Sequence, residues 1–225
     1  MDKSRTEISK KSAGEKAADY ALDGMVLGLG TGSTVKYFIE RLAERIKEES
    51  LEVVAVPTSI ASERLAKGLG IKLTNLSEHP VIDLDVDGAD EVDPNFNLIK
   101  GGGGAHAREK VVASASKEFI VIVDEAKMVK RLGVFPVPVE VIPFSLGFVG
   151  KEIERMGGIA KKRQGFVSDN GNIVLDAKFN IVDPLRLEED LKTIPGVVEN
   201  GIFAKRRPEK VVVGMGKEVK VLERE

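Results

Sequence analysis

Residues 82–91 read Ile-Asp-Leu-Asp-Val-Asp-Gly-Ala-Asp-Glu. The first half of this segment alternates apolar and acidic residues, as a strand does. A glycine-rich loop at 100–104 follows, then a helical pattern over 105–116 and an apolar run at 119–123. This order of strand, helix and buried strand is typical of an α/β domain with a mainly parallel sheet. Because such sheets bind ligands at the carboxyl ends of their strands, the acidic half of the segment is expected to lie at a functional site.

The preceding residues extend the same pattern. Apolar runs at 25–30 and 53–56 predict further buried strands, while 35–46 and 60–68 have helical spacing. An amphipathic helix is expected over 7–22, short strands at 71–73 and 82–86, and a strand at 211–214 that rejoins this domain. We therefore predict a Rossmann-like, mainly parallel sheet.

The pattern changes after Leu132, where three prolines punctuate the chain between 136 and 143. Strands are predicted at 137–142, 159–163, 173–179 and 197–204, and helices at 145–156 and 184–191, with a hairpin turn at Asp169-Asn170-Gly171. The order β-α-β-β-α-β predicts a small α+β, ferredoxin-like cap domain. We place it at 133–206, inserted into an α/β domain made of 1–132 and 207–225.

Composition excludes several classes of function. The 225 residues include 34 basic and 36 acidic side chains, a balance that gives no general attraction for nucleic acid. Without cysteine there is no disulfide, thiolate nucleophile or cysteine-based metal site, and two histidines make a zinc site unexpected. The apolar runs are too short for a membrane span, so a cytoplasmic protein is expected. The basic runs 161–163 and 205–207 are expected to be solvated surface.

The turn Gly28-Leu29-Gly30-Thr31-Gly32-Ser33-Thr34 joins a predicted strand to a predicted helix. Backbone N–H groups at such a helix start attract anions, and Thr31, Ser33 and Thr34 add hydroxyl donors. The turn lacks the third glycine of the dinucleotide fingerprint and the Gly-Lys-Ser/Thr of a Walker A loop. Phosphate binding is favoured, and a helix cap made by Ser33 or Thr34 is the alternative.

Carboxylates and a lysine surround the glycine loop. Asp87 and Asp90 flank Gly88 and Ala89 at the end of the strand, and Lys100 precedes the glycines. Glu109 lies about one turn into the following helix, where an ordinary surface glutamate is the alternative. Residues 83–88 resemble the start of an EF-hand loop, but its twelfth position is Pro94, so no metal site is predicted. Together these groups could move protons on a small, oxygen-rich anion.

Taken in order, the motifs resemble the type A ribose-5-phosphate isomerase family. The resemblance covers nearly the whole chain: Gly-Leu-Gly-Thr-Gly-Ser-Thr at 28–34, Val-Pro-Thr-Ser at 56–59, Asp-Gly-Ala-Asp-Glu at 87–91, Ile-Lys-Gly-Gly-Gly at 99–103, Arg-Glu-Lys at 108–110, Pro-Val-Glu-Val-Ile-Pro at 138–143 and Ile-Pro-Gly-Val-Val-Glu-Asn-Gly-Ile-Phe at 194–203. It implies interconversion of ribose 5-phosphate and ribulose 5-phosphate through a cis-enediolate, without metal or organic cofactor.

The resemblance also implies roles for particular residues. Glu109 would be the base, with Asp87, Asp90 and Lys100 as the other catalytic groups. The implied substrate-binding residues are Thr31, Gly32, Ser33, Thr34, Gly88, Ala89, Gly101, Gly102, Gly103, Lys127 and Lys10. A homodimer or homotetramer is implied. His106 stands where relatives often have an aliphatic residue, and it is expected to make a local polar contact.

Two other interpretations stay open at this stage. The first is an amino-sugar phosphate deaminase or a CoA transferase with the same α/β fold; the paired acidic and glycine segments and the predicted cap argue against it. The second is a non-catalytic sugar-phosphate sensor, as in the effector modules of some repressors. Residues 1–24 are too short for the DNA-binding segment that such a sensor normally carries.

Overall fold

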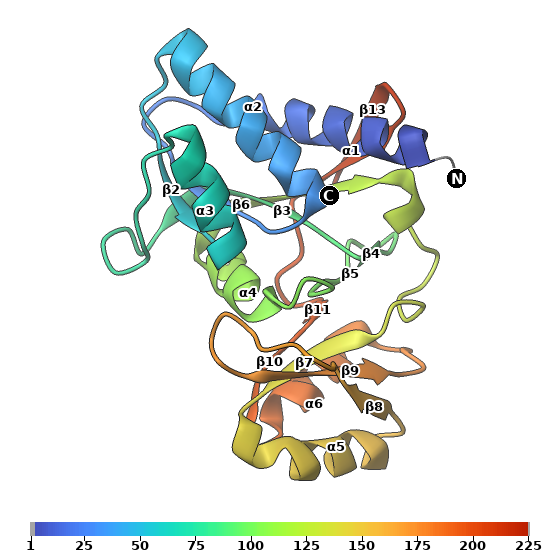
Figure 1. Cartoon of the computed structure of the whole chain (residues 1–225). Helices are drawn as coiled ribbons and strands as arrows, with labels where there is room; N and C mark the ends of the chain where they lie inside the picture. Colours follow the sequence, from blue (N-terminus) through green and yellow to red (C-terminus); the bar gives the residue numbers. More distant parts are fainter. Residues whose placement is uncertain (1–2, 225) are drawn as a thin grey trace. The chain divides into compact units, whose positions relative to one another are not determined.

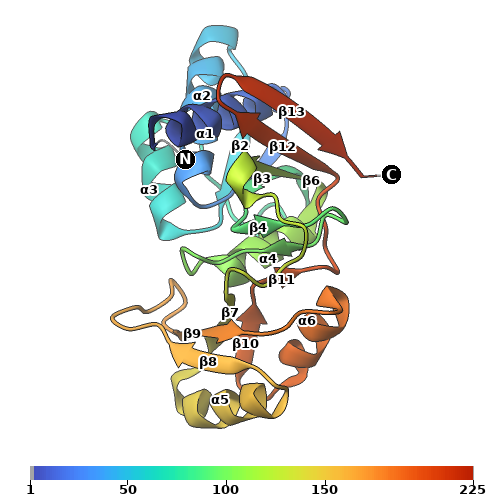
Figure 2. The ribbon, with the colours of Figure 1, turned by 90° about the vertical axis from the view of Figure 1, so that its right-hand side faces the viewer.

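A six-stranded sheet forms the centre of the first of two units in the computed structural model, which describes residues 3–224 (Figures 1 and 2). Its strand order is β13-β12-β6-β3-β1-β2. All neighbours from β12 to β2 are parallel, and β13 pairs with β12 as an antiparallel edge hairpin. The strands are β1 (Val26–Leu29), β2 (Val54–Pro57), β3 (Ile82–Gly88), β6 (Ser116–Asp124), β12 (Lys210–Met215) and β13 (Glu218–Glu223). The predicted mainly parallel α/β sheet, including the return of the chain at 211–214, is confirmed.

Helices cover both faces of this sheet. The helices are α1 (Lys3–Ala18), α2 (Ser33–Glu49), α3 (Ile60–Leu69) and α4 (His106–Ala115), with a short 3-10 turn η1 (Glu125–Lys127) after β6. Figure 1 shows α1 beside α2, and their small and apolar residues, such as Ala17 and Phe38, pack with Leu27 of β1. On the other face, Val112 of α4 packs against Val56 and Ile82. This two-sided burial explains why the strands are apolar runs.

The order of the strands creates a switch point in the sheet. From β1 the chain passes through α2 to β2 on one side, then through α3 to β3 on the other side of β1. Leu27 of β1 thus pairs with Ala55 of β2 and with Leu84 of β3. In open α/β sheets ligands bind at the carboxyl ends of strands where the order reverses. Here those ends carry the turn 30–34 and Asp87.

The second unit contains a four-stranded antiparallel sheet of order β10-β7-β9-β8. Its elements are β7 (Val137–Val141), the 3-10 turn η2 (Pro143–Ser145), α5 (Leu146–Arg155), β8 (Ile159–Lys162), β9 (Ile173–Lys178), α6 (Pro184–Thr193) and β10 (Val197–Asn200). Val149 of α5 and Leu191 of α6 pack with Val139 of β7 in one core. This is the predicted β-α-β-β-α-β arrangement. The predicted turn at 169–171 exists, but it lies within a longer connection, 163–172, between β8 and β9.

A three-stranded antiparallel sheet in the same unit was not predicted. It consists of β4 (Glu91–Val92), β5 (Leu98–Ile99) and β11 (Ile202–Phe203), in the order β11-β5-β4. The single strand predicted at 197–204 is therefore divided into β10 and β11, with Gly201 between them. The strand predicted at 71–73 is reduced to one bridge between Leu73 and Ala55. The strands β4, β5 and β11 were not predicted because two residues are too few to show a periodic pattern.

The chain passes between the two units several times. Unit 1 runs to Gly88, resumes over Val111–Met128 and continues from Pro208; unit 2 consists of Ala89–Lys110 and Val129–Arg207. The predicted domain boundaries assign 89–110 to the α/β domain, whereas by its contacts this segment groups with unit 2. Whether 133–206 is a domain in its own right stays a prediction.

Candidate active site

In unit 1, the turn after β1 leads directly into α2. The helix begins at Ser33 after Gly32, and no side chain caps its first N–H groups. The alternative in which Ser33 or Thr34 caps this helix is therefore not observed. Gly32 and Ser33 are exposed and Thr34 is half-buried. An uncapped helix N-terminus is suited to an anion, because its N–H groups and the helix dipole both favour negative charge.

Thr31 differs from its neighbours in the turn, because its hydroxyl forms hydrogen bonds with side chains of unit 1. Its Oγ1 lies 2.8 Å from Oγ1 of Thr58 and donates to Oγ of Ser59 at 2.8 Å. Ser59 is also the N-cap of α3, where it accepts a hydrogen bond from the N–H of Ser62. These bonds join the ends of β1 and β2, so the side chain of Thr31 shapes the turn.

Asp87 is buried at the carboxyl end of β3. Its Oδ1 accepts hydrogen bonds from the N–H of Thr31 at 2.9 Å and of Gly88 at 2.7 Å. A Cβ on Gly30 would lie 2.2 Å from the same oxygen, so only glycine permits this close approach. The contact links the turn after β1 to the end of β3, as the switch point predicts. Gly88 itself is half-buried.

The two predicted phosphate lysines lie on separate elements of unit 1. Lys127 ends η1, directly after β6, and is half-buried. Lys10 lies on α1, where its ammonium forms an ion pair with Oε1 of Glu7 at 2.7 Å. Hydrogen bonds from Lys10 and then Tyr37 lower the pKa of Glu7.

In unit 2, Lys100 and Glu109 form a buried ion pair. Nζ of Lys100 lies 3.3 Å from Oε2 of Glu109, and the two side chains are only 2% and 5% exposed. The Lys100 ammonium also lies 5.5 Å from the centre of the Phe203 ring. The alternative of Glu109 as an ordinary surface glutamate is thus wrong. A buried, paired carboxylate and ammonium each stabilise the charged form of the other.

The acidic residues after β3 act on different parts of the backbone. Oδ2 of Asp90 accepts a hydrogen bond from the N–H of Gly102 at 2.7 Å, which ties the acid to the glycine loop. Glu91, although adjacent, is buried and accepts from the N–H groups of Gly133 and Phe135, a structural role. Ala89 precedes Asp90 and is half-buried. Unit 2 thus brings Asp90, Lys100, the glycine loop and Glu109 together.

His106 lies beneath the glycine loop. A Cβ on Gly101 would lie 2.7 Å from Nδ1 of the imidazole, and Nε2 of His106 lies 3.4 Å from the carbonyl oxygen of Glu199. The expected local polar contact is confirmed. Burial lowers the pKa of His106 to about 4, although the charge of Glu140 acts to raise it. The imidazole is therefore neutral at neutral pH.

Next to the Lys100–Glu109 pair lies a second charged group that was not predicted. Lys110 pairs with Glu188 at 2.8 Å and Glu199 at 3.2 Å, and its ammonium lies 4.8 Å from the centre of the Phe203 ring. Burial acts to raise the pKa of Glu199, but the charge of Lys110 and a hydrogen bond from Lys192 outweigh it, so this pKa is lowered. The ring of Phe203 therefore lies close to two ammonium groups, those of Lys100 and Lys110. In the sequence, the only feature that could have pointed to this group is that Lys110 directly follows Glu109.

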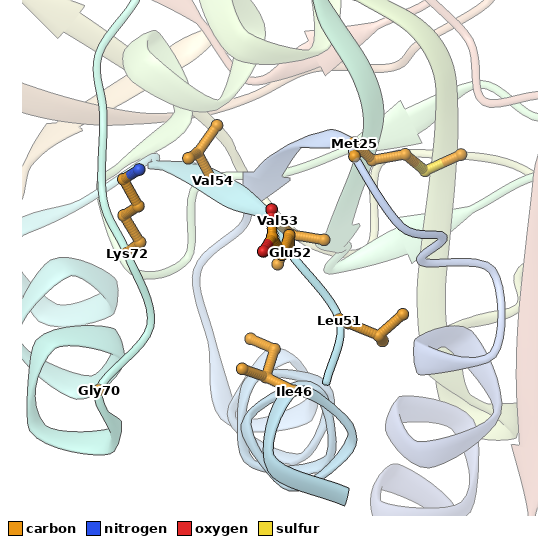
Figure 3. A pocket seen from close by; sticks show the side chains of 9 residues that line it. Met25, Ile46, Leu51, Glu52, Val53, Val54, Gly70 and Lys72 are labelled. Carbon is orange, nitrogen blue, oxygen red and sulfur yellow. The ribbon is translucent and has the colours of Figure 1, made fainter. Parts of the chain in front are cut away.

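A hollow in unit 1 lies near the amino ends of β1 and β2 (Figure 3). It has a volume of about 450 Å³ and is lined by Gly24, Met25, Ile46, Leu51, Glu52, Val53, Val54, Gly70 and Lys72. Gly24 and Met25 precede β1, and residues 51–54 precede or begin β2, whereas the turn 30–34 and Asp87 lie at the opposite, carboxyl ends of the strands. The hollow is thus not the site that carries the predicted residues. Among residues 3–224, no helix is both long and apolar enough to cross a membrane.

Comparisons with known proteins agree with the order of these motifs. The family model described as ribose 5-phosphate isomerase A (phosphoriboisomerase A) matches residues 54–218. The ribose-5-phosphate isomerase A of Methanothermobacter thermautotrophicus is 54% identical over 220 residues, which cover 95% of this chain and 96% of that protein. The ribose-5-phosphate isomerase A of Streptococcus gordonii is 47% identical over 222 residues, covering 96% of this chain and 98% of that protein.

Solved structures agree with the fold along nearly the whole chain. The structure of ribose 5-phosphate isomerase A from Methanocaldococcus jannaschii has a TM-score of 0.92 at 46% identity and covers 96% of this chain and 98% of its own. A D-ribose-5-phosphate isomerase in complex with phospho-erythronic acid has a TM-score of 0.94 at 46% identity, covering 97% of this chain and 99% of its own.

Proposed function

Since the chain belongs to the ribose 5-phosphate isomerase A family, we propose that Glu109 is the base of its aldose–ketose isomerisation. Glu109 takes the proton from C2 of open-chain ribose 5-phosphate and returns it to C1, which yields ribulose 5-phosphate. The observation that carries this proposal is the buried Lys100–Glu109 pair at 3.3 Å. A hydrogen on carbon next to a carbonyl is weakly acidic, so the base needs an electrophile to stabilise the enediolate.

Lys100 is the proposed electrophile. Its ammonium stabilises the negative charge that develops on the substrate oxygen, together with N–H groups of Gly101 and Gly103, while the N–H of Gly102 is held by Asp90. Asp90 supports this loop through its hydrogen bond to Gly102. Asp87 assists ring opening and proton transfer at the sugar hydroxyls. Gly88 and Ala89, beside the two acids, complete the proposed sugar contacts. This set of groups needs no metal or organic cofactor for the steps proposed.

The phosphate is proposed to bind to groups of unit 1. The uncapped start of α2, from Gly32 to Thr34, supplies N–H and hydroxyl donors, and Thr31 holds the turn in shape. Lys127 adds a positive charge, and Lys10 is proposed as a second one. One related isomerase was solved with a phosphorylated acid, phospho-erythronic acid, which supports a sugar phosphate as the ligand of this chain too.

We also propose that the protein acts in the cytoplasm as a homodimer or homotetramer. Phe144 is 98% exposed and Phe148 is 50% exposed, both near the start of α5. Contiguous exposed apolar surface, rather than single exposed residues, marks interaction sites, and we propose that Phe144 and Phe148 belong to one such surface. Light scattering coupled to size-exclusion chromatography tests the oligomeric state. A monomer at micromolar concentration would contradict it.

The test of the chemistry is proton exchange on ribose 5-phosphate in deuterated water with a chelator present, comparing wild type with Glu109→Gln. The wild type is expected to form ribulose 5-phosphate with solvent deuterium at C1. Glu109→Gln keeps the shape of the side chain and removes the base, so kcat is expected to fall about 10²- to 10⁴-fold. Its KM is expected to change little.

Glu189→Gln is the matched control, because Glu189 is an exposed residue of α6. It should retain wild-type exchange. Substrate binding to the wild type without exchange would support a sugar-phosphate sensor instead, and activity lost on chelation would overturn the metal-free mechanism.

A further inference from the structure

One arginine of the connection between β8 and β9 holds the glycine loop. Nη1 of Arg163 donates to the carbonyl oxygens of Gly101 and Gly102, at 3.2 Å each. Its side chain is only 17% exposed, so the expectation that 161–163 is entirely a solvated basic run is wrong at this position. Lys161 and Lys162 are exposed as expected. Both partners of these hydrogen bonds belong to unit 2.

Arg163 is itself fixed from the other side. Its Nε donates to Oδ2 of Asp176 at 3.0 Å and its Nη2 donates to Oδ1, a two-point contact that only a guanidinium can make. The guanidinium carbon also lies 5.3 Å from the centre of the Phe166 ring. That ring packs against Gly104, where a Cβ would lie 2.1 Å from Cζ and where φ is +78°. Asp176 and Phe166 therefore hold the guanidinium of Arg163 in place beside the glycine loop.

These contacts, together with the hydrogen bond from the N–H of Gly104 to the carbonyl oxygen of Gly101 at 2.9 Å, orient the peptide groups of the loop. In a trans peptide, the C=O of one residue and the N–H of the next point in opposite directions, and no cis peptide occurs among residues 3–224. The C=O of Gly101 points to Arg163, and the N–H of Gly102 accordingly points the other way, to Asp90. The C=O of Gly102 also points to Arg163, so the N–H of Gly103 points away from it.

We infer that Arg163 is a positioning residue for the reaction: it orients the peptides 101–102 and 102–103 so that the N–H of Gly103 faces the developing enediolate oxygen. This inference rests on the proposed function of the glycine loop. Arg163 does not touch the substrate; it acts through the loop that joins Lys100 to the helix carrying Glu109. An N–H donor that is already oriented stabilises charge in the transition state without a cost of reorganisation.

Arg163→Lys tests the inference, because lysine keeps the charge and cannot form the two-point contact. We expect kcat to fall on the order of 10- to 100-fold, as for a small misplacement of catalytic groups, while KM changes by less than about 3-fold. Amide hydrogen exchange at Gly102 and Gly103, measured by NMR without substrate, is expected to be faster. Asp176→Asn should show the same effects more weakly, and adding it to Arg163→Lys should cause little further loss.

Arg131→Lys is the matched control. Arg131 also holds a backbone carbonyl of unit 2, that of Ile181 at 2.6 Å, but away from the glycine loop. A folded Arg163→Lys protein with unchanged kcat and unchanged exchange overturns the inference, and so does an equal loss of kcat in Arg131→Lys. If the wild type fails to isomerise ribose 5-phosphate, the proposed function fails, and the exchange data still decide whether Arg163 orders the loop. If Arg163→Lys does not fold, Asp176→Asn decides by the same two measurements.

Discussion

Asp87, Asp90 and Glu91 show how neighbouring acids acquire different roles. Asp87 accepts from the N–H groups of Thr31 and Gly88, Asp90 from Gly102, and Glu91 from Gly133 and Phe135. Their spacing in the sequence predicted a functional cluster at a strand end. It could not separate the two proposed catalytic acids from the structural one, because the partners of each acid come from distant segments.

His106 gives a prediction about stability at this scale. Its pKa is lowered to about 4 by burial, while an unfolded chain has the ordinary value of 6.5. Between these values the unfolded state binds more protons, so stability decreases as the pH falls from about 6.5 and the loss is complete below about 4. A shift of that size corresponds to about 3 kcal/mol.

Urea unfolding of His106→Gln at several pH values measures this contribution. In this variant, the free energy of unfolding is expected to fall less steeply than in the wild type as the pH decreases from 6.5 to 4. His79→Gln removes the only other histidine of the chain and shows whether the effect belongs to His106. An unchanged slope in His106→Gln contradicts the prediction.

Longer strands and helices were predicted, whereas the two-residue strands β4, β5 and β11 and the charged edge strand β13 were not. The strands β1, β2, β6 and β12 appear where apolar runs predicted them, and β3 appears where apolar and acidic residues alternate. The edge strand β13, Glu218–Glu223, was missed, although Val219 and Val221 alternate with charged residues as in a half-exposed strand. Its place depends on pairing with β12.

The contact between α1 and β12 gives a prediction at this scale. A Cβ on Gly214 would lie 1.9 Å from the carbonyl oxygen of Ser9, so helix and strand meet through their backbones. Gly214→Ala is therefore expected to destabilise the fold by about 2 kcal/mol or more. Gly68, inside α3, has nothing within 4 Å of its Cβ position, and Gly68→Ala is expected to stabilise by about 0.5–1 kcal/mol. Thermal unfolding compares the two; a neutral Gly214→Ala would contradict this packing.

At the scale of the whole molecule, the two units are interleaved in sequence. Residues 89–110 supply unit 2 with β4 and β5, the core residue Ile99, and Lys110, the partner of Glu188 and Glu199. A fragment of 129–207 lacks them. Removing one partner of a buried ion pair costs about 3–5 kcal/mol, a large part of the stability of a small domain.

We therefore expect the fragment 129–207 to show no cooperative unfolding transition by circular dichroism in urea, whereas the intact chain shows one. A cooperative transition in the fragment would contradict this expectation. It would support an autonomous cap domain at 133–206, as the change of pattern after Leu132 suggests.

The sequence by itself determined the alternation of strands and helices, the order of the cap elements, the glycine loop and the acids beside it. These features follow from short-range periodicity and from residue types with narrow conformational preferences. Only the tertiary structure decided that Lys100 pairs with Glu109, that Thr31 is engaged with Thr58 and Ser59, and that Arg163 reaches the glycine loop. Each of these contacts joins residues that the loops and strands between them bring together, and the local pattern at either end carries no information about its partner.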